Sequence, residues 1–289
     1  MSGTIPDITL VKIRRKRVCR FGRRVLGERF LMEEKSIRYV IKFQYKGTEF
    51  SGYQVQPEKR TVQGEIELAL KNIFFEDIKI YASGRTDARV HALAQIAHFD
   101  AQKKFSESQL IHLLNRELPS DISVLEAGIV DEDFDARFDA TSKTYIYKFY
   151  LSRFEKPLYS NLATRVNDNV NVEKMQEACS YLLGEHDFKS FVARKSGKED
   201  FVRTIYSAKI TKTDSDLYEF EISANGFLYN MVRIIFGTLI EVGSGRLKPE
   251  EVGLVIESKS RSKAGKTYSP DGLYLKNVEY KKHIQMKRA

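Results

Sequence analysis

Strand and helix patterns follow one another in the same order in both parts of this chain. In the first part, alternating apolar and polar residues at 37–45 predict a strand, followed by helix, strand, strand, helix and strand. In the second part, the strand predicted at 144–151 begins the same series, and one at 272–280 ends it. This β-α-β-β-α-β order is typical of a ferredoxin-like unit. We therefore predict an α+β fold of two ferredoxin-like halves, with mainly antiparallel sheet, flanking helices and an active-site cleft between the halves.

Local signals predict where several helices begin or end. Thr61 is a favoured N-cap residue, and Ser106 with Gln109 has the spacing of a capping box. Gly184 is expected to cap the helix predicted from Val172 to Leu183. An almost wholly apolar helix is expected at about 227–240, and a further helix near 249–257.

These patterns divide the chain into four segments. A basic extension at 1–35, expected to be disordered, precedes an N-terminal half at 36–140 and a C-terminal half at 141–282, and a basic tail follows at 283–289. Residues 1–31 contain nine Lys or Arg residues against Asp7 and Glu28, so they carry seven of the nine net positive charges of the chain. Binding of nucleic acid by the two halves must therefore depend on local basic patches.

Composition excludes several classes of protein. No apolar run approaches the length of a membrane span, and the two cysteines, Cys19 and Cys179, form no CxxC pair. A disulfide framework and a zinc ribbon are therefore not expected, and we expect a soluble protein of the reducing cytoplasm. The chain also lacks a Walker loop and the glycine fingerprint of dinucleotide-binding proteins.

A lone acid lies in the basic stretch "SGRTDARVHA". Asp87 stands between Arg85 and Arg89, with His91 four residues beyond. The composition fits a solvated turn, and it also fits a nucleophile that its neighbours keep ionised. An aspartate has an ordinary pKa of about 3.9, and a neighbouring guanidinium lowers it. His91 could suggest a metal site, but further ligands at metal spacing are missing, so we expect it to be a packing or hydrogen-bonding residue.

A lone base lies on the predicted apolar helix. Arg233 is the only charged residue at 227–240, and a buried guanidinium is costly unless it is paired. Either its side chain extends to the surface or it meets Asp87 across the two halves. The strand "SKTYIYKFY" leaves a similar choice, because Tyr145 and its neighbours can stack on a base or form the core face of a strand.

These segments together resemble one known family. "GTEFSGYQVQPEKRTVQGEIELAL", "GRTDARVHALAQIAHFD", "LLNRELPSDI", "FDARFDATSKTYIY", "GEHDFKSF", "VRTI", "NGFLYNMVRIIFGTLIEVGSGR" and "GLYLKNVEY" resemble, in this order, the TruA family of tRNA pseudouridine synthases. The resemblance covers about residues 37 to 281. It implies an isomerase that converts uridine to pseudouridine at positions 38 to 40 of the tRNA anticodon stem-loop, as a homodimer and without a cofactor or catalytic metal.

The resemblance also implies roles for four residues. Asp87 matches the nucleophile, Tyr145 the tyrosine that stacks on the target base, and Arg233 the arginine paired with the aspartate. Arg85 matches the arginine that handles the flipped nucleotide. The target uridine must leave the helical stack before the enzyme can reach its glycosidic bond. The sequence leaves open whether the aspartate attacks the base or the sugar.

Two positions depart from the family pattern. Arg89 stands where the family usually has glycine, and Tyr53 where it usually has tryptophan. Because glycine often serves a special backbone angle, we expect Arg89 to alter the loop or to add a phosphate contact. These two departures bear more on which uridine is the target than on whether the protein catalyses the isomerisation.

Alternatives remain for the function and for the extension. The rivals are a paralogous synthase with another RNA target, an RNA-binding protein without turnover, and a metal-dependent nuclease, which the lack of clustered carboxylates disfavours. The extension lacks the apolar core of a secretory signal. It is a basic RNA-binding arm, a targeting segment, or an upstream stretch not normally translated, and the first and last are favoured.

Overall fold

In the computed structural model of this chain, the residues that can be described are 36–193, 200–214, 216–282 and 284–289. Residues Lys35–Ala289 form one compact unit. The basic extension predicted at 1–35 lies outside the described residues. Within the described ranges, no helix is long and apolar enough to cross a membrane.

The first six elements appear in the predicted order. They are β1 (Ile37–Tyr45), α1 (Val62–Phe74), β2 (Tyr81–Ala82), β3 (His91–Ala101), α2 (Glu107–Glu117) and β4 (Ile122–Val130). Thr61 accepts a hydrogen bond from the Gly64 amide and caps α1, and Ser106 and Gln109 form the predicted capping box of α2. The expected helix starts are therefore confirmed.

The second series contains more elements than the pattern predicted. It comprises β5 (Ala140–Leu151), β6 (Thr164–Val166), α3 (Val172–Cys179), β7 (Gly184–Asp187), β8 (Val202–Lys212), β9 (Leu217–Ala224), α4 (Met231–Gly243), α5 (Glu251–Glu257) and β10 (Leu273–Tyr280). Short 3₁₀ helices lie in the connections at Gly47–Glu49, Pro157–Tyr159, Ser180–Leu182, Lys189–Phe191 and Arg261–Lys263. The chain then forms β11 (Lys287–Arg288) within the segment predicted as a basic tail.

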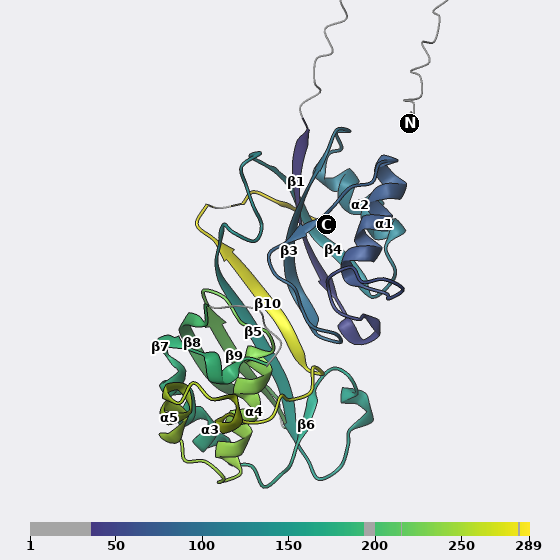
Figure 1. The fold of residues 1–289 in the computed structure, drawn as a ribbon. Helices are drawn as coiled ribbons and strands as arrows, with labels where there is room; N and C mark the ends of the chain where they lie inside the picture. Colours follow the sequence, from purple (N-terminus) through teal and green to yellow (C-terminus); the bar gives the residue numbers. More distant parts are fainter. Residues whose placement is uncertain (1–35, 194–199, 215, 283) are drawn as a thin grey trace, which may run out of the picture. The chain divides into compact units, whose positions relative to one another are not determined.

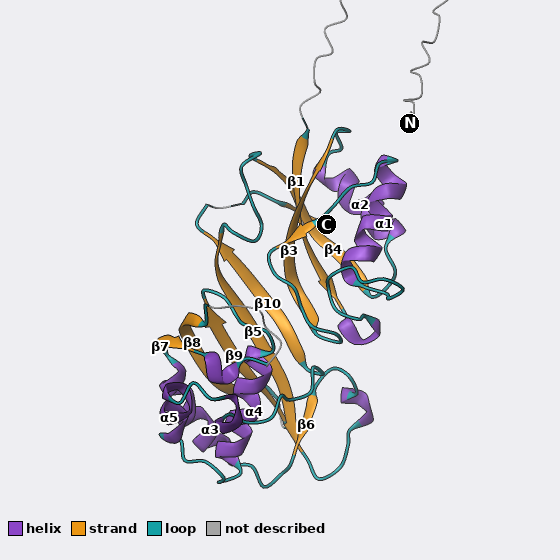
Figure 2. Ribbon diagram, in the orientation of Figure 1, coloured by secondary structure: helices purple, strands orange, loops and turns teal. Residues whose placement is uncertain are grey.

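The strands form a single sheet (Figures 1 and 2). Their order is β11-β4-β1-β3-β10-β5-β9-β8-β7, with β2 paired to β3 and β6 paired to β5. Pairing is antiparallel except between β3 and β10 and between β5 and β6. The predicted α+β fold, with mainly antiparallel sheet and flanking helices, is confirmed.

The division into two ferredoxin-like halves remains a prediction about domain organisation. The order β4-β1-β3-β2 occurs in one part of the sheet and β10-β5-β9-β8 in the other. However, β3 and β10 pair in parallel at His91 with Tyr274 and at Ala92 with Leu275, and this pairing joins both sets of strands. The boundary predicted near residue 140 is therefore a boundary in the sequence pattern, and the sheet runs across it.

Two hydrophobic cores lie on this sheet. One packs α1 and α2 on the strands at the β1 end, around Tyr39, Phe43 and Phe99, which are all fully buried. The other packs α3, α4 and α5 on the strands at the β5 end, around Phe149, Phe220 and Phe236. Helices thus cover both groups of strands (Figure 1), and the connections between β2 and β3 and before α4 remain available to form a cleft.

Candidate active site

A cleft of about 910 Å³ is lined by residues from both groups of strands. The β2–β3 connection contributes Asp87 and Arg85, β5 contributes Tyr145, and α4 contributes Arg233. The structure therefore brings together the four residues to which the family resemblance gave roles. A volume of this size is in the range of ligand-binding sites. The charged side chains that line the cleft include five basic residues (Arg85, Arg137, Lys143, Arg203 and Arg233) and three acidic ones (Asp87, Asp135 and Asp200).

The loop that carries Asp87 has no regular secondary structure, but hydrogen bonds fix it on both sides. The Thr86 hydroxyl lies 2.8 Å from the Tyr45 hydroxyl, and the Thr86 carbonyl accepts a hydrogen bond from the Tyr53 amide at 3.1 Å. On the other side of the loop, the Gln95 side-chain amide donates to the Gly84 carbonyl at 2.8 Å. Gly52 has a φ of +100°, and a Cβ there would approach the Thr86 carbonyl to 3.0 Å. The "SGYQ" segment thus supports the loop that presents the aspartate.

Arg233 meets Asp87 across the cleft. Its Nη1 lies 3.7 Å from the Asp87 Oδ2, and the two side chains are 17% and 28% exposed. Of the alternatives that the sequence left open for Arg233, the structure therefore confirms the ion pair with Asp87. Two further hydrogen bonds fix the Arg233 guanidinium. Its Nε donates to the Tyr268 carbonyl at 2.8 Å, and its Nη1 donates to Asn230 Oδ1 at 2.7 Å.

Burial shifts the pKa of Asp87 in the direction opposite to the one that its neighbours in the sequence suggested. We expected the surrounding guanidinium groups to hold the pKa of Asp87 below its ordinary value. That expectation is wrong, because burial in the cleft raises the pKa of Asp87 and the attraction of Arg233 opposes this only in part. The fold therefore disfavours the carboxylate form of Asp87 relative to an aspartate in water.

Tyr145 provides an aromatic surface next to this pair. Its ring packs edge-on against Phe227, with the ring centroids 5.1 Å apart and the planes at 86°. Burial, with Tyr45 and Asp87 nearby, raises the pKa of the Tyr145 hydroxyl well above its ordinary value. Tyr145 is therefore a neutral phenol at physiological pH. Its position suits contact with a flat, uncharged group in the cleft.

Arg85 differs from the other predicted residues because its side chain is exposed. It makes no hydrogen bond or ion pair with any residue in the described ranges. A guanidinium without a protein partner at the edge of a cleft is available for a phosphate or a base.

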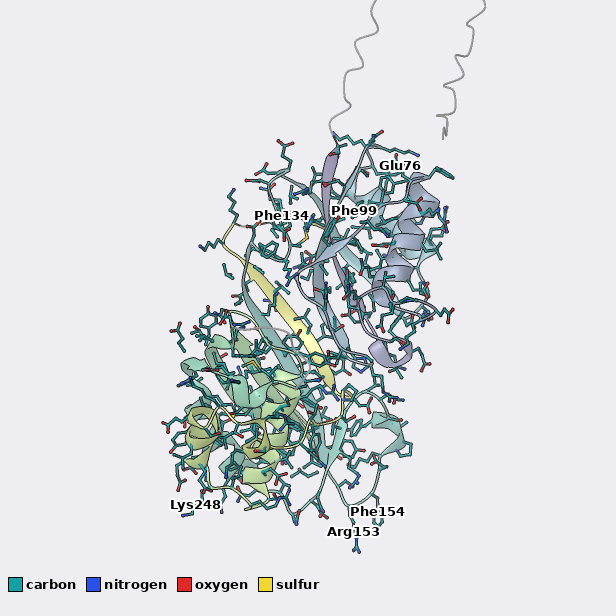
Figure 3. All side chains as sticks on the ribbon, in the orientation of Figure 1. Glu76, Phe99, Phe134, Arg153, Phe154 and Lys248 are labelled. Atoms are coloured by element: carbon teal, nitrogen blue, oxygen red, sulfur yellow. The ribbon has the colours of Figure 1, made fainter. Side chains whose placement is uncertain are left out.

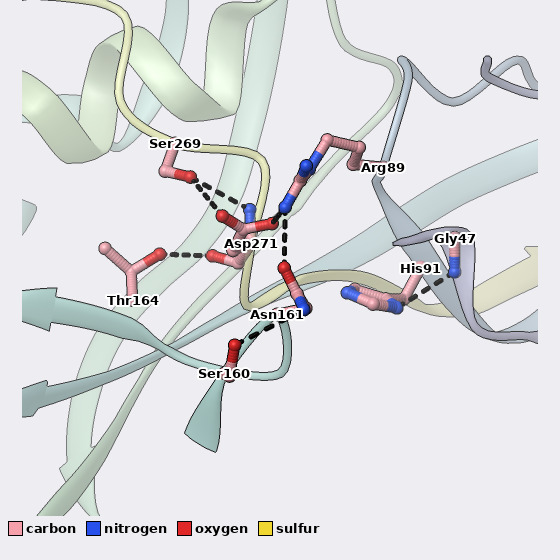
Figure 4. Close-up of polar contacts among 8 residues, drawn as sticks. All are labelled: Gly47, Arg89, His91, Ser160, Asn161, Thr164, Ser269 and Asp271. Carbon is pink, nitrogen blue, oxygen red and sulfur yellow. Dashed lines mark hydrogen bonds and ion pairs between the residues drawn. The ribbon is translucent and has the colours of Figure 1, made fainter. Parts of the chain in front are cut away.

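Arg89 ties the loop to the other group of strands. Its backbone has a φ of +68°, a left-handed conformation that explains why glycine suits this position. Its Nη2 donates to Asn161 Oδ1 at 2.6 Å and forms an ion pair with Asp271 Oδ1 at 2.9 Å (Figure 4). Arg89 thus adds contacts within the protein, and the phosphate contact that the sequence suggested stays a prediction.

His91 has the packing role that the sequence favoured. Its Nδ1 accepts a hydrogen bond from the Gly47 amide at 3.0 Å (Figure 4), and its ring stacks on Tyr274 with the centroids 4.5 Å apart. Burial lowers the pKa of His91 to about 4, so the ring is neutral at physiological pH. In the described part of the chain, no group of three or more His, Cys, Asp or Glu side chains is placed to hold a metal ion.

Sequence reasoning missed the residues that orient Arg233. Asn230 adopts a left-handed backbone conformation (φ 59°) at the start of α4 and aims its side-chain oxygen at the guanidinium. The Tyr268 carbonyl comes from a connection 35 residues further along the chain. Asparagine tolerates a left-handed conformation better than most residues, and this was the only local signal at Asn230.

Comparisons with known proteins identify the family of this chain. The family described as tRNA pseudouridine synthase matches residues 41–139 and 178–281. A relative from Caldicellulosiruptor saccharolyticus called tRNA pseudouridine synthase A is 44% identical over 241 residues, which cover 83% of this chain and 98% of the relative. A protein of the same name from Halalkalibacterium halodurans is 47% identical over 82% of this chain and 90% of its own length. The chain therefore belongs to the tRNA pseudouridine synthase family.

Proposed function

We propose that this protein isomerises uridine to pseudouridine at positions 38 to 40 in the anticodon stem-loop of tRNA, with Asp87 as the nucleophile. The observation that carries the proposal is the partly buried ion pair of Asp87 and Arg233 beside Tyr145, in a cleft where basic side chains predominate. Family membership supports the substrate class, because the relatives are called tRNA pseudouridine synthase A. We further propose a cytoplasmic homodimer that needs no cofactor.

The residues suit the chemistry of this isomerisation. The glycosidic bond between N1 of uracil and C1′ of ribose breaks, and a bond between C5 and C1′ replaces it. C5 loses its proton to solvent, and N1 ends protonated, so no other reactant is consumed. An Asp87 carboxylate that attacks the sugar carbon displaces the uracil and is itself displaced when C5 bonds to C1′, whereas attack on the base gives an adduct of Asp87 with the uracil. In either case Asp87 is bonded to one fragment only, and the cleft must hold the other fragment while the uracil turns.

Tyr145, Arg233 and Arg85 bind the substrate or orient the reacting groups. The ring of Tyr145 offers a stacking surface for the uracil, in place of the neighbours that the base loses when it leaves the helix. Arg233 favours the charged form of Asp87 and so offsets part of the effect of burial. The exposed guanidinium of Arg85 is free to bind the nucleotide backbone at the edge of the cleft.

The test is to incubate the purified protein with an unmodified tRNA transcript and to map pseudouridine by carbodiimide labelling and primer extension. We expect new stops only where they report pseudouridine at positions 38 to 40, that is, one nucleotide 3′ of each modified base. Stops elsewhere would instead support a paralogous synthase with another target. A transcript without any new stop would exclude the proposed activity on that tRNA.

Replacement of the nucleophile is the matched control. Asp87→Asn keeps the shape of the side chain and removes its nucleophilic charge, so we expect no detectable pseudouridine while the variant still binds tRNA. Pseudouridine formed above background by a pure Asp87→Asn preparation would contradict the role of Asp87.

A further inference from the structure

We propose that Phe138 is a substrate-binding residue that stacks on an unpaired base next to the reacting uridine. Phe138 lies in the connection between β4 and β5 and lines the same cleft as Asp87. This inference rests on the proposed function, because it requires that the cleft receive RNA. It adds a second aromatic contact, separate from Tyr145, outside the place where the reacting base would lie.

Exposure first singles out Phe138. Its side chain is 78% exposed, and burial of such a ring would normally be favourable. Two other aromatic side chains that line the cleft are also exposed, Tyr81 at 56% and Tyr229 at 51%. The ring of Tyr81 is already stacked on His98 with centroids 5.3 Å apart. Phe138 has no such aromatic partner among the described residues, so it offers the most open apolar ring surface in the cleft.

The turn that carries Phe138 is firmly held. The Asp135 carboxylate accepts hydrogen bonds from the Arg137 amide at 2.7 Å and from the Phe138 amide at 3.0 Å. Ala136 is fully buried, its amide donates to His98 Nδ1 at 3.1 Å, and its carbonyl accepts from the Tyr280 hydroxyl at 2.7 Å. Because the backbone on the N-terminal side of the ring is anchored to the sheet, the ring is presented at a defined place at little further entropic cost on binding.

A basic side chain lies beside the Phe138 ring. The Arg137 guanidinium lies 5.4 Å from the centroid of the Phe138 ring. A cation near one side of an aromatic ring leaves another side for a base, and the same guanidinium can reach a phosphate. Arg85 adds an exposed positive charge in the same cleft. The β4–β5 connection also contains five acidic residues (Asp131, Glu132, Asp133, Asp135 and Asp139), so the case for RNA rests on the cleft as a whole, which five basic and three acidic side chains line.

The chain contains a closely matched control. Phe154 is 73% exposed, and the guanidinium of its preceding residue, Arg153, lies 5.7 Å from its ring centroid. Phe154 does not line the cleft, and it lies far from Phe134 of the β4–β5 connection in Figure 3. Phe138 and Phe154 therefore share residue type, exposure and a neighbouring arginine, and they differ in position.

The first experiment measures affinity for an unmodified tRNA transcript in the Asp87→Asn background, so that turnover does not interfere. We expect Phe138→Ala to weaken binding by about 5- to 150-fold, the range for loss of one stacked base. Phe138→Leu should weaken tRNA binding to a similar extent. Phe138→Tyr, which keeps an aromatic ring, should bind as tightly as the protein with Phe138, and Phe154→Ala should leave the affinity unchanged. The slope of log affinity against log salt should stay the same in Phe138→Ala, because no phosphate contact is lost.

The second experiment uses the absence of tryptophan from the sequence. Phe138→Trp and Phe154→Trp each introduce a single tryptophan, which can be excited selectively over the tyrosines, and we expect saturating tRNA to quench the tryptophan emission of Phe138→Trp alone. Equal responses of the two variants, or unchanged affinity in Phe138→Ala, would overturn the inference. If wild-type protein forms pseudouridine on the same transcript in that case, only the role of Phe138 is refuted. If wild-type protein forms none, the proposed function is refuted with it.

Discussion

At the scale of single residues, the site depends on a carboxylate that its surroundings only partly stabilise. Burial raises the pKa of Asp87, whereas Arg233 at 3.7 Å lowers it, and burial has the larger effect. A raised folded-state pKa means that the fold favours protonated Asp87. The corresponding stability is present at acid pH and is lost as the pH rises through the folded-state pKa. Above that pKa, ionised Asp87 therefore destabilises the protein.

This balance predicts the pH dependence of the reaction. The single-turnover rate should rise with pH as Asp87 ionises, with a midpoint above the ordinary aspartate pKa of about 3.9. Arg233→Gln removes the attraction that opposes burial, so the midpoint should move to higher pH, whereas Arg233→Lys should move it less. Rate–pH profiles of the three proteins check this. A midpoint that stays in place in Arg233→Gln would contradict the electrostatic role of Arg233.

Asn230 is predicted to position Arg233. Asn230→Gly keeps the left-handed backbone and removes the oxygen that accepts from the guanidinium at 2.7 Å. Loss of a hydrogen bond to a charged group corresponds to a decrease of about 10- to 100-fold in turnover. Asn230→Asp retains an acceptor and should keep more of the turnover. Steady-state kinetics should show the loss in kcat, and a loss confined to KM would argue against this role.

At the scale of elements, the β2–β3 connection is tied to the other group of strands through Arg89. Its guanidinium contacts Asn161, before β6, and Asp271, before β10 (Figure 4). The Arg89–Asp271 pair is partly exposed, at 45% and 25%, so it should contribute no more than about 1 kcal/mol to stability. The left-handed backbone of Arg89 opposes this contribution.

Two substitutions separate these effects. Arg89→Gly loses the side-chain contacts and relieves the backbone, so its free energy of unfolding should stay within about 1 kcal/mol of wild type. Arg89→Ala loses the contacts and keeps the unfavourable φ, so it should be less stable than Arg89→Gly by about 1 kcal/mol. Urea unfolding measures both values. Greater stability of the alanine variant would show that the left-handed conformation is not retained.

At the scale of the whole molecule, most of the net positive charge belongs to the extension, outside the described residues. If residues 1–31 bind RNA, truncation to start at Met32 should leave the chemical step intact and weaken tRNA affinity. The slope of log affinity against log salt should also decrease, by about 0.7–0.9 for each phosphate no longer neutralised. Titration of both forms at several salt concentrations checks this. Coincident lines would show that the extension does not contact tRNA.

The sequence by itself determined what depends on neighbours along the chain. Helix caps at Thr61 and Ser106, strand alternation in β1 and the motifs around Asp87 could all be predicted, because each arises from residue types at short spacing. The partner of Arg233 could also be predicted, since a lone guanidinium on an apolar helix needs an anion and the motifs supplied Asp87.

Only the tertiary structure decided what depends on residues brought together from far along the chain. The direction of the Asp87 pKa shift follows from burial by elements of both strand groups, and sequence neighbours alone suggested the opposite sign. Arg89 and Asp271 are 182 residues apart in the sequence, yet their side chains form a hydrogen bond. The pairing of β3 with β10 likewise joins strands that are far apart in the sequence. Desolvation, ion pairing and exposure of a ring such as Phe138 depend on the surrounding space, which short-range sequence patterns do not specify.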